Sequence, residues 1–274
     1  MGYRLIALDL DGTILVAGQP PSEHLLGALD AAQQQGAVLS LATGRPFASA
    51  HAHATAFGMR GPVICMQGAL VKEQTDGCPT LLASRLPVAP LAGLIEFAER
   101  RRQEITLYTE DELYVSDMQH SREFYDLWFG VPINHVPNLA AAAGDLHRRG
   151  MALTKVLFMG EPDAMGALEQ ELRAMLPAEL SVVRSHAYFV EVVGSDASKG
   201  HALAFLAQRY GLQQAETMAI GDSGNDVSMI KWAGMGIAMA NAAPEVLSAA
   251  DWVAPPVTED GVVAALERFV LRSP

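Results

Sequence analysis

The stretch LIALDLDGT, residues 5–13, ends an apolar run in two carboxylates, Asp9 and Asp11, with Gly12 directly behind them. The run 3–8 predicts a strand buried on both faces, which is typical of a parallel sheet. In open parallel sheets, ligands bind outside the carboxyl ends of the strands, where both acids fall. The stretch therefore predicts a parallel sheet with a binding or reaction site at the end of its first strand.

The composition is that of a globular, acidic protein. A length of 274 residues suggests one or two domains, at about 150 residues each. Hydrophobic residues make up 50% of the chain and charged residues 18%, which is enough for a packed core. The formal net charge of -12 repels phosphate backbones and anionic membranes, so we expect neither nucleic acid nor a membrane as partner. A small anion can still bind where a local cation opposes the overall field.

Cysteine content and hydropathy bear on the compartment. Cys65 and Cys78 are too few for a disulfide framework and indicate a reducing environment. The apolar run before Asp9 is too short for the core of a signal peptide, and no segment approaches the ~18 apolar residues of a membrane span. We therefore expect a cytoplasmic protein, while the sequence carries no signal of oligomeric state.

Strands and helices alternate through the first 66 residues. After the strand 3–8, the segment 20–36 predicts a helix with Ser22 as N-cap and Gly36 as its stop. A strand over 37–42, a helix that opens at TGRP (43–46) and ends near Gly58, and a third strand over 62–66 follow. This alternation predicts a parallel sheet covered by helices on both faces.

The pattern changes between residues 86 and 193. The predicted elements there are a helix over 88–102, strands over 105–109, 112–116, 152–159, 180–185 and 188–193, and a helix over 163–176. They predict an α+β unit inserted into the first domain, so that the core comprises 1–85 and 194–274. The alternation resumes with a helix over 198–211, a strand over 216–222, a helix over 225–234 and a strand over 235–240.

The motif DLDGT has three interpretations. Asp and Gly favour turns, so the motif alone is a weak signal. An EF-hand loop needs an acidic twelfth residue, but the twelfth position from Asp9 is Pro20. In a phosphoryl-transfer site, one carboxylate attacks phosphorus, the other carries the proton, and a divalent cation screens the charge.

Residues suited to phosphate and metal occur at the other predicted strand ends. Thr43 and Gly44 follow the second strand at a predicted helix start, where a hydroxyl and free N–H groups can hold phosphate oxygens, although Thr43 also suits an N-cap. Lys199 stands just inside a helix start, where its charge opposes the helix dipole and therefore suggests a phosphate-neutralising role. The run GDSGND (221–226) adds an acidic cluster with oxygen ligands suited to Mg²⁺.

Four motifs in this order, DLDGT, ATGR, SKG and GDSGNDVSMI, resemble those of the haloacid dehalogenase-like (HAD) phosphatases. The later AGMGIAMANA and EDG also resemble the Cof-type subgroup, and the resemblance spans nearly the whole chain. It implies an α/β fold with a Rossmann-like, doubly wound parallel-sheet core and an inserted α+β cap of the C2B type. It also implies Mg²⁺-dependent hydrolysis of phosphate monoesters through an aspartyl-phosphate.

The resemblance assigns roles to individual residues. Asp9 would be the nucleophile and a metal ligand, and Asp11 the general acid and then base, with its backbone carbonyl on the metal. Asp222 would complete the protein's metal ligands. Asp226 would either bind the metal directly or hold a metal-binding residue in place. The phosphoryl group would be held by Leu10, Thr43, Gly44, Lys199 and Asn225, the last of which could instead position Lys199.

One position departs from the family pattern. The family usually has Asn-Gly-Ala after the third strand, whereas this chain has Gln67-Gly68-Ala69, so contacts of that loop cannot be carried over. The sequence GDSG also resembles a serine-protease nucleophile around Ser223, but a turn residue is the favoured interpretation. His51 and His53 do not share a helix face, so they predict no metal site.

The inserted unit should select the substrate, because the core motifs contact only phosphate and metal. Arg45, Arg184 and His186 are the candidate substrate residues, although a surface ion pair is the simpler interpretation of Arg184. Further polar candidates are Tyr108, Glu110, Tyr114 and Lys155. The resemblance favours sugar phosphates, with pyridoxal phosphate or another small phosphorylated metabolite as alternatives. A phosphomutase and a non-catalytic Mg²⁺/phosphometabolite-binding regulator are the alternative functions.

Overall fold

The computed structural model describes residues 2–16, 18–121, 123–125, 129 and 131–271. Its centre is a five-stranded sheet in the order β14-β13-β12-β1-β2, in which every neighbouring pair is parallel. The strands are β1 (Leu5–Leu8), β2 (Val38–Leu41), β12 (Thr217–Gly221), β13 (Met235–Met239) and β14 (Trp252–Ala254). The prediction of a parallel sheet is confirmed.

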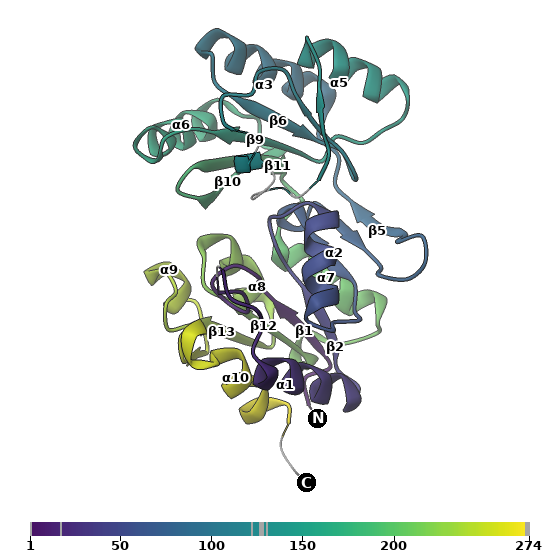
Figure 1. Cartoon of the computed structure of the whole chain (residues 1–274), viewed down its shortest axis with the longest axis vertical. Helices are drawn as coiled ribbons and strands as arrows, with labels where there is room; N and C mark the ends of the chain where they lie inside the picture. The colour runs from purple at the N-terminus through teal and green to yellow at the C-terminus, as the bar shows by residue number, and fades with distance from the viewer. Residues whose placement is uncertain (1, 17, 122, 126–128, 130, 272–274) are drawn as a thin grey trace.

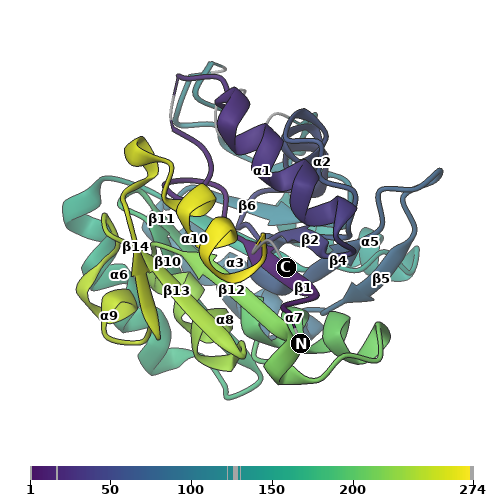
Figure 2. The same cartoon turned by 90° about the horizontal axis from the view of Figure 1, so that it is seen from below.

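Helices cover both faces of this sheet, as Figures 1 and 2 show. Ile6 and Leu8 of β1 pack into one apolar cluster, and Leu5 and Ala7 pack into another on the opposite face. The first cluster is closed by α1 (Glu23–Gln34), α2 (Phe47–Ala56) and α10 (Gly261–Phe269), the second by α7 (Lys199–Arg209) and α8 (Val227–Trp232). The alternation of side chains along a strand thus makes β1 fully buried.

The ends of two helices agree with the sequence prediction. The Ser22 hydroxyl accepts a hydrogen bond from the amide of Leu25 at 3.1 Å and caps α1. The Ser198 hydroxyl does the same for α7, accepting from the amide of His201 at 3.1 Å. Both contacts satisfy amides that lack a partner within the helix.

The third predicted strand does not continue the parallel sheet. β3 (Val63–Cys65) lies beside the end of β2, where Ala42 and Ile64 form a parallel bridge and the Thr43 amide donates to the Ile64 carbonyl oxygen at 2.9 Å, but no longer ladder forms. It pairs antiparallel with β4 (Leu70–Lys72), which pairs with β5 (Thr80–Ala83) in a separate three-stranded sheet. After β3, Met66 and Gln67 both take the left-handed backbone conformation and reverse the chain into β4.

Residues 86–193 form most of a second, six-stranded sheet in the order β10-β11-β9-β6-β7-β8. Its strands are β6 (Ile105–Tyr108), β7 (Leu113–Val115), β8 (Ile133–His135), β9 (Lys155–Met159), β10 (Leu180–His186) and β11 (Phe189–Gly194). They pair antiparallel as predicted, except that β7 and β8 are parallel. The predictions missed β8 and the helix α5, and Gly194, placed in the core, still belongs to β11.

Three helices pack on one face of the second sheet, namely α3 (Val88–Arg101), α5 (Leu139–Arg148) and α6 (Pro162–Met175). The alternate residues of its strands, including Leu157 and Phe189, belong instead to the cluster shared with the core sheet. In Figure 1 the second sheet therefore lies with its uncovered face toward the ends of the core strands. Among the described residues, no helix is long and apolar enough to cross a membrane.

The order of the core strands determines where a ligand can bind. From β1 the chain goes to β2 on one side and, after the second sheet, to β12 on the other, so the strand order reverses at β1. Loops that leave neighbouring strands in opposite directions open a crevice at their carboxyl ends. Asp9 follows β1, Thr43 follows β2 and Asp222 follows β12. The three motifs therefore meet at this crevice.

Candidate active site

Three carboxylates and one ammonium group form the centre of the site. One oxygen each of Asp9, Asp222 and Asp226 lies within 4.8 Å of the others. The Lys199 Nζ donates hydrogen bonds of 2.6 Å to both Asp9 and Asp226. Asp226 is fully buried and Lys199 is 1% exposed. The structure thus brings together four residues that the sequence placed at separate strand and helix ends.

The charges of this cluster do not balance. If all three carboxyls are ionised, their charge of −3 and the +1 of Lys199 leave −2 in a buried site. Burial, followed by the charge of Asp226, raises the pKa of Asp9 well above its ordinary value, although Lys199 opposes the shift. Burial and Asp226 likewise raise the pKa of Asp222 to about 6. For Lys199, burial lowers the pKa, but the two carboxylates outweigh it and raise the pKa overall.

The excess negative charge fits a divalent cation. Carboxylate oxygens are the ligands that Mg²⁺ prefers, and a charge of +2 offsets the imbalance. Burial and the charge of Asp226 raise the pKa of both Asp9 and Asp222, and a cation bound between them would oppose this shift. Asp9, Asp222 and Asp226 are therefore the residues that could hold the metal.

Local backbone structure fixes the position of Asp222. Gly12 has φ of 87°, and a Cβ atom there would lie 2.4 Å from the Asp222 Oδ2. The Thr13 hydroxyl donates to Asp222 Oδ1 at 3.1 Å. Asp226 accepts from the amides of Asp222 and Ser223, both at 3.0 Å. Gly12 is required both for the left-handed turn and for the close approach of the carboxylate.

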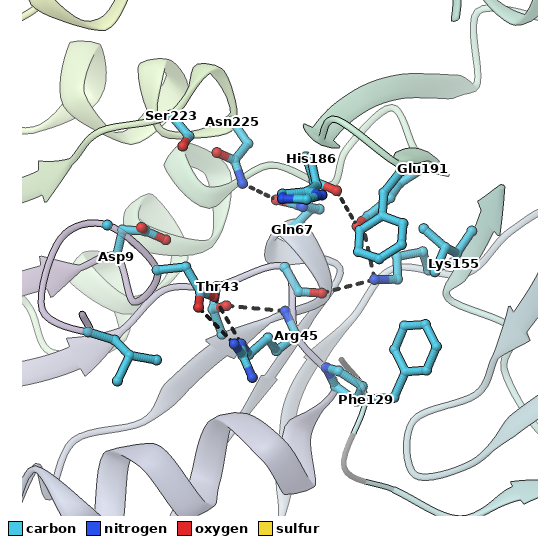
Figure 3. Close-up of a pocket in the computed structure, with 18 of the residues that line it drawn as sticks. Asp9, Thr43, Arg45, Gln67, Phe129, Lys155, His186, Glu191, Ser223 and Asn225 are labelled. Atoms are coloured by element: carbon cyan, nitrogen blue, oxygen red, sulfur yellow. Dashed lines mark hydrogen bonds and ion pairs between the residues drawn. The ribbon is translucent and has the colours of Figure 1, made fainter. Parts of the chain in front are cut away.

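The Asp11 carboxylate lies outside the acidic cluster. It accepts two hydrogen bonds from the Arg45 guanidinium, at 2.9 Å from Nε and 2.7 Å from Nη2. Bidentate pairs of this kind are strong and directional. Arg45, predicted as a substrate residue, therefore lies beside the predicted general acid (Figure 3).

The turn after β2 lies beside the acidic cluster but does not begin a helix. Thr43 was expected at a helix start, whereas α2 begins only at Phe47, after Pro46. The Thr43 hydroxyl instead accepts from the Arg45 amide at 3.2 Å, within the turn. The presence of Pro46, which has an extended backbone, delays the helix. Among the described residues, no acceptor bonds the amides of Leu10 and Gly44, so both are available to an anion.

Asn225 lies in the site but does not contact Lys199. Its Nδ2 donates a hydrogen bond of 2.9 Å to the Oε1 of Gln67. Lys199 uses its short contacts on Asp9 and Asp226 instead. Two roles were predicted for Asn225, holding the phosphoryl group and positioning Lys199. Its hydrogen bond to Gln67 does not support the second role.

A pocket of about 420 Å³ extends from the cluster to the second sheet. The core contributes the motif residues together with Leu15, Val16, Pro46 and Val257. The facing wall comprises Tyr108, Phe129, Lys155, Leu157, Ser185, His186, Phe189 and Glu191. This wall is mostly aromatic or aliphatic, with a buried ion pair of 3.2 Å between Lys155 and Glu191.

Lys155 connects the second sheet to the turn after β2. Its Nζ donates to the carbonyl oxygen of Gly44 at 2.9 Å and lies 4.2 Å from the ring centre of Tyr108. Glu110 and Tyr114, by contrast, do not line the pocket and bond to Thr80 and Glu112, respectively. Of these four candidates, the structure places Tyr108 and Lys155 in the pocket wall.

His186 and Arg184 separate in the structure. The ring of His186 lines the pocket, and its pKa is lowered, mainly by burial. Arg184 instead points at the turn between β10 and β11, where it donates to the carbonyl oxygens of His186 and Ala187 at 2.8 and 2.7 Å. Arg184 was predicted to contact the substrate. These two bonds direct its guanidinium to the β10–β11 turn, and Arg184 is not among the residues that line the pocket.

A family model described as haloacid dehalogenase-like hydrolase matches residues 6–266. The chain belongs to the haloacid dehalogenase-like hydrolase family. It is 34% identical over 274 residues to a Bacillus subtilis (strain 168) protein named "Putative phosphatase YxeH", covering 98% of this chain and 99% of that protein. It is 28% identical over 247 residues to the HMP-PP phosphatase of Serratia proteamaculans (strain 568), covering 90% and 87%.

Solved structures of this hydrolase family have the same fold. A haloacid dehalogenase-like hydrolase from Bacteroides thetaiotaomicron superimposes with a TM-score of 0.83 at 30% identity, covering 97% of this chain and 99% of that one. Because the superposition covers 97% of this chain, it includes both of the sheets seen in Figure 1.

The structure places the serine and the two histidines that were set aside from the sequence. Ser223 forms a capping box with Asp226, which confirms it as a turn residue, although it lies at the pocket edge. His51 stacks on Phe47 with 5.3 Å between ring centres. Burial and the charge of Arg45 lower the pKa of His53.

Sequence reasoning missed several residues of the hydrolase site. Thr13 was part of DLDGT, but nothing in the sequence pairs it with Asp222. Asn241 donates to the carbonyl oxygen of Gly12 at 3.0 Å and so braces the catalytic turn. Phe189 was only part of a predicted strand. Asn241 could have been found from the sequence, because it lies in AGMGIAMANA, one of the motifs that resemble the Cof-type subgroup.

Proposed function

We propose that this protein is a Mg²⁺-dependent phosphatase that hydrolyses small phosphorylated metabolites through an aspartyl-phosphate on Asp9. The observation that carries the proposal is the cluster of Asp9, Lys199 and two further carboxylates at one end of the pocket between the two sheets. Phosphoryl transfer needs an ionised nucleophile, cations around the phosphoryl oxygens and a dry site. Asp9 would be the nucleophile, Lys199 and a bound Mg²⁺ would be the cations, and the apolar wall of the pocket would limit the access of water.

In the first step, an Asp9 carboxylate oxygen attacks phosphorus while the bond from phosphorus to the leaving oxygen breaks. Asp11, in its protonated form, gives that oxygen its proton. In the second step, the Asp11 carboxylate takes a proton from water, whose oxygen attacks the aspartyl-phosphate. The bond between phosphorus and Asp9 breaks, and inorganic phosphate leaves. For the first step Asp11 must be released from Arg45, which holds it as an ion pair in this structure.

The phosphoryl oxygens have several donors within the site. Thr43 and Gly44 line the pocket with Asp9, Leu10 follows Asp9 in the chain, and the Lys199 ammonium bonds Asp9 directly, so the amides of Leu10 and Gly44, the Thr43 hydroxyl and Lys199 are the donors that we assign to the phosphoryl oxygens. Mg²⁺, held by Asp9 and Asp222 with Asp226, and by the Asp11 carbonyl, would screen the phosphoryl charge and keep Asp9 ionised.

Residues 86–193 would act as the cap that selects the substrate. Their sheet supplies the apolar wall opposite the cluster and the Lys155–Glu191 pair. A pocket of about 420 Å³ suits a small metabolite. Rings in the wall, such as Phe189, can stack against the flat face of a pyranose or a pyridine, so sugar phosphates and pyridoxal phosphate are the substrates that we propose to test first.

The test is phosphate release from sugar phosphates, pyridoxal phosphate, nucleotides and an aryl phosphate, with Mg²⁺ and with EDTA. We expect Mg²⁺-dependent turnover that Asp9→Asn abolishes and that Asp30→Asn, a change in an exposed surface ion pair, leaves intact. Turnover that survives Asp9→Asn would refute the aspartyl-phosphate. A wild type that binds Mg²⁺ but releases phosphate from no ester would favour the regulator, and isomerisation that needs a bisphosphate would favour the mutase.

A further inference from the structure

The turn that holds Gln67 is strained and buried. Met66 and Gln67 have φ of 50° and 62°, a conformation uncommon for residues other than glycine. Gln67 is only 2% exposed. Strain of this kind persists only where the surroundings fix it, and it concentrates at functional sites.

Gln67 stands where three catalytic motifs meet. Its amide donates to the carbonyl oxygen of Thr43 at 3.2 Å, and the Met66 amide donates to that of Arg45 at 3.1 Å. The next residue, Gly68, packs so closely against the backbone of Ser198 that a Cβ atom would lie 2.2 Å from its carbonyl oxygen. The Gln67 side chain reaches Asn225. The turn therefore joins the phosphate-binding turn to the loops that carry Lys199 and the acidic cluster.

Only one of the two polar atoms of the Gln67 side chain has a hydrogen-bond partner among the described residues. Its Oε1 accepts from Asn225, but its Nε2 is enclosed and meets no acceptor in the part of the chain that the structure describes. The Oδ1 of Asn225 is likewise enclosed and unpaired. A buried amide group without a partner is costly, and in a native site it calls for a ligand or a catalytic role.

The unpaired Nε2 lies against Gly44. A Cβ atom on Gly44 would be only 2.3 Å from it, so only glycine leaves room for the amide there. Gly44 also has its own unpaired amide and lines the pocket with Gln67 and Asn225 (Figure 3). Two amide donors without acceptors thus lie side by side next to the Asp9 pocket.

We propose that Gln67 is a phosphoryl-contacting residue. Its Nε2 donates a hydrogen bond to a phosphoryl oxygen held at Thr43 and Gly44, while its Oε1 orients the amide of Asn225. The ligand class is a tetrahedral oxyanion, either the phosphoryl group of the ester or the inorganic phosphate product. This inference rests on the proposed phosphatase function and extends it to a residue that the family motifs leave without a role.

The test measures binding of inorganic phosphate by calorimetry in the presence of Mg²⁺, alongside kcat and KM for an aryl phosphate. Gln67→Met removes the donor and the acceptor. Gln67→Glu keeps an acceptor for Asn225 but presents an anion in place of the NH2 group. Gln74→Met is the matched control, since Gln74 also donates from a partly buried amide to backbone carbonyls, away from the site.

We expect Gln67→Met to weaken phosphate binding and lower kcat/KM by about 10- to 100-fold, the range for a lost hydrogen bond to a charged group. Gln67→Glu should lose at least as much, and Gln74→Met should stay within about twofold of wild type in both readouts. Gln67→Asn keeps the amide on a shorter side chain and takes the left-handed backbone more easily. The Gln67→Asn variant should bind phosphate less tightly than wild type but melt at the same temperature. If Gln67 had only a structural role, its replacement would lower the melting temperature as well.

Three outcomes would overturn the inference. Unchanged phosphate affinity in a folded Gln67→Met does so directly. A Gln67→Glu variant that matches wild type while Gln67→Met does not would show that the side chain acts only through Asn225. If Gln67→Met fails to fold, unchanged affinity in Gln67→Asn decides against the inference. A wild type that binds phosphate but hydrolyses no ester would instead overturn the proposed function, because the binding readout needs no turnover.

Discussion

Asp222→Asn should change how the stability of the metal-free protein depends on pH. The pKa of Asp222 is raised from 3.8 to about 6, because the carboxyl is partly buried and lies beside Asp226. The folded state therefore holds the proton more tightly than the unfolded state does. Its contribution to stability is present at low pH and is lost as pH rises from the unfolded pKa through the folded one.

The structure gives the size of this effect. A shift of about 2 pKa units corresponds to about 3 kcal/mol in all, which is a ceiling because Asp222 is not fully buried. Of this, about 1.4 kcal/mol is lost between pH 5 and pH 8. Asparagine carries no titrating proton and still accepts from Thr13. In EDTA, the free energy of unfolding of Asp222→Asn should therefore rise by up to about 1.4 kcal/mol relative to that of wild type between pH 5 and pH 8.

The assay is urea unfolding of both proteins in EDTA at pH 5, 6, 7 and 8, with Asp30→Asn as an exposed control. The comparison of two variants at each pH cancels the titrating groups that do not interact with Asp222. Asp222 itself raises the pKa of Asp9, so its neutralisation relieves Asp9 as well and changes stability in the same direction. Mg²⁺ should raise the melting temperature of wild type more at pH 8 than at pH 5, because protons compete for the same oxygens. A stability difference that is independent of pH, or that favours wild type as pH rises, would refute the charge imbalance on which the metal site rests.

Three further predictions follow from single contacts. Lys199→Met leaves buried carboxylates without their cation, so the free energy of unfolding should fall by about 3–5 kcal/mol in urea at pH 7.5; a loss no larger than that of the exposed Lys231→Met would contradict this. Gly12→Ala should cost about 1–2 kcal/mol for the left-handed backbone and weaken Mg²⁺ binding in calorimetry, because its Cβ displaces Asp222, and unchanged affinity would count against that contact. Phe189→Leu should raise KM about 2- to 10-fold for ring-bearing phosphates but not for glycerol phosphate; equal effects on both would argue against ring stacking.

Much of the core could be predicted from the sequence, because its signals are local. Continuous apolar strands, the Ser22 and Ser198 caps and the glycine stops each depend on a few neighbouring residues. The ordered motifs likewise placed Asp9, Lys199 and the 221–226 loop at chain positions that converge in any parallel sheet. These predictions hold because strand order and handedness leave few ways to arrange such elements.

Other features depend on contacts between distant segments. β3 lies beside the end of β2 with a parallel bridge, as predicted, but the ladder does not extend, and a left-handed turn at Met66 and Gln67 then leads the chain into an antiparallel hairpin with β4 that was not predicted. No sequence pattern marks that conformation in residues other than glycine, since only the surrounding packing enforces it. Strand β8 has only three residues and gives little pattern to detect. The helix α5 did carry local signals, an Asn138 cap and an alanine-rich run, which the sequence reading overlooked.

The sequence by itself determined the chemistry of the site: which carboxylates, which ammonium group and which hydroxyl-bearing turn it contains. Only the tertiary structure decided how these groups pair. It joined Asp11 to Arg45, turned Arg184 away from the pocket and left the amide of Gln67 without an acceptor beside Gly44. The physical reason is that residue type fixes which bonds a group can make, whereas packing across sequence separations of up to 229 residues within the site fixes which partner it meets.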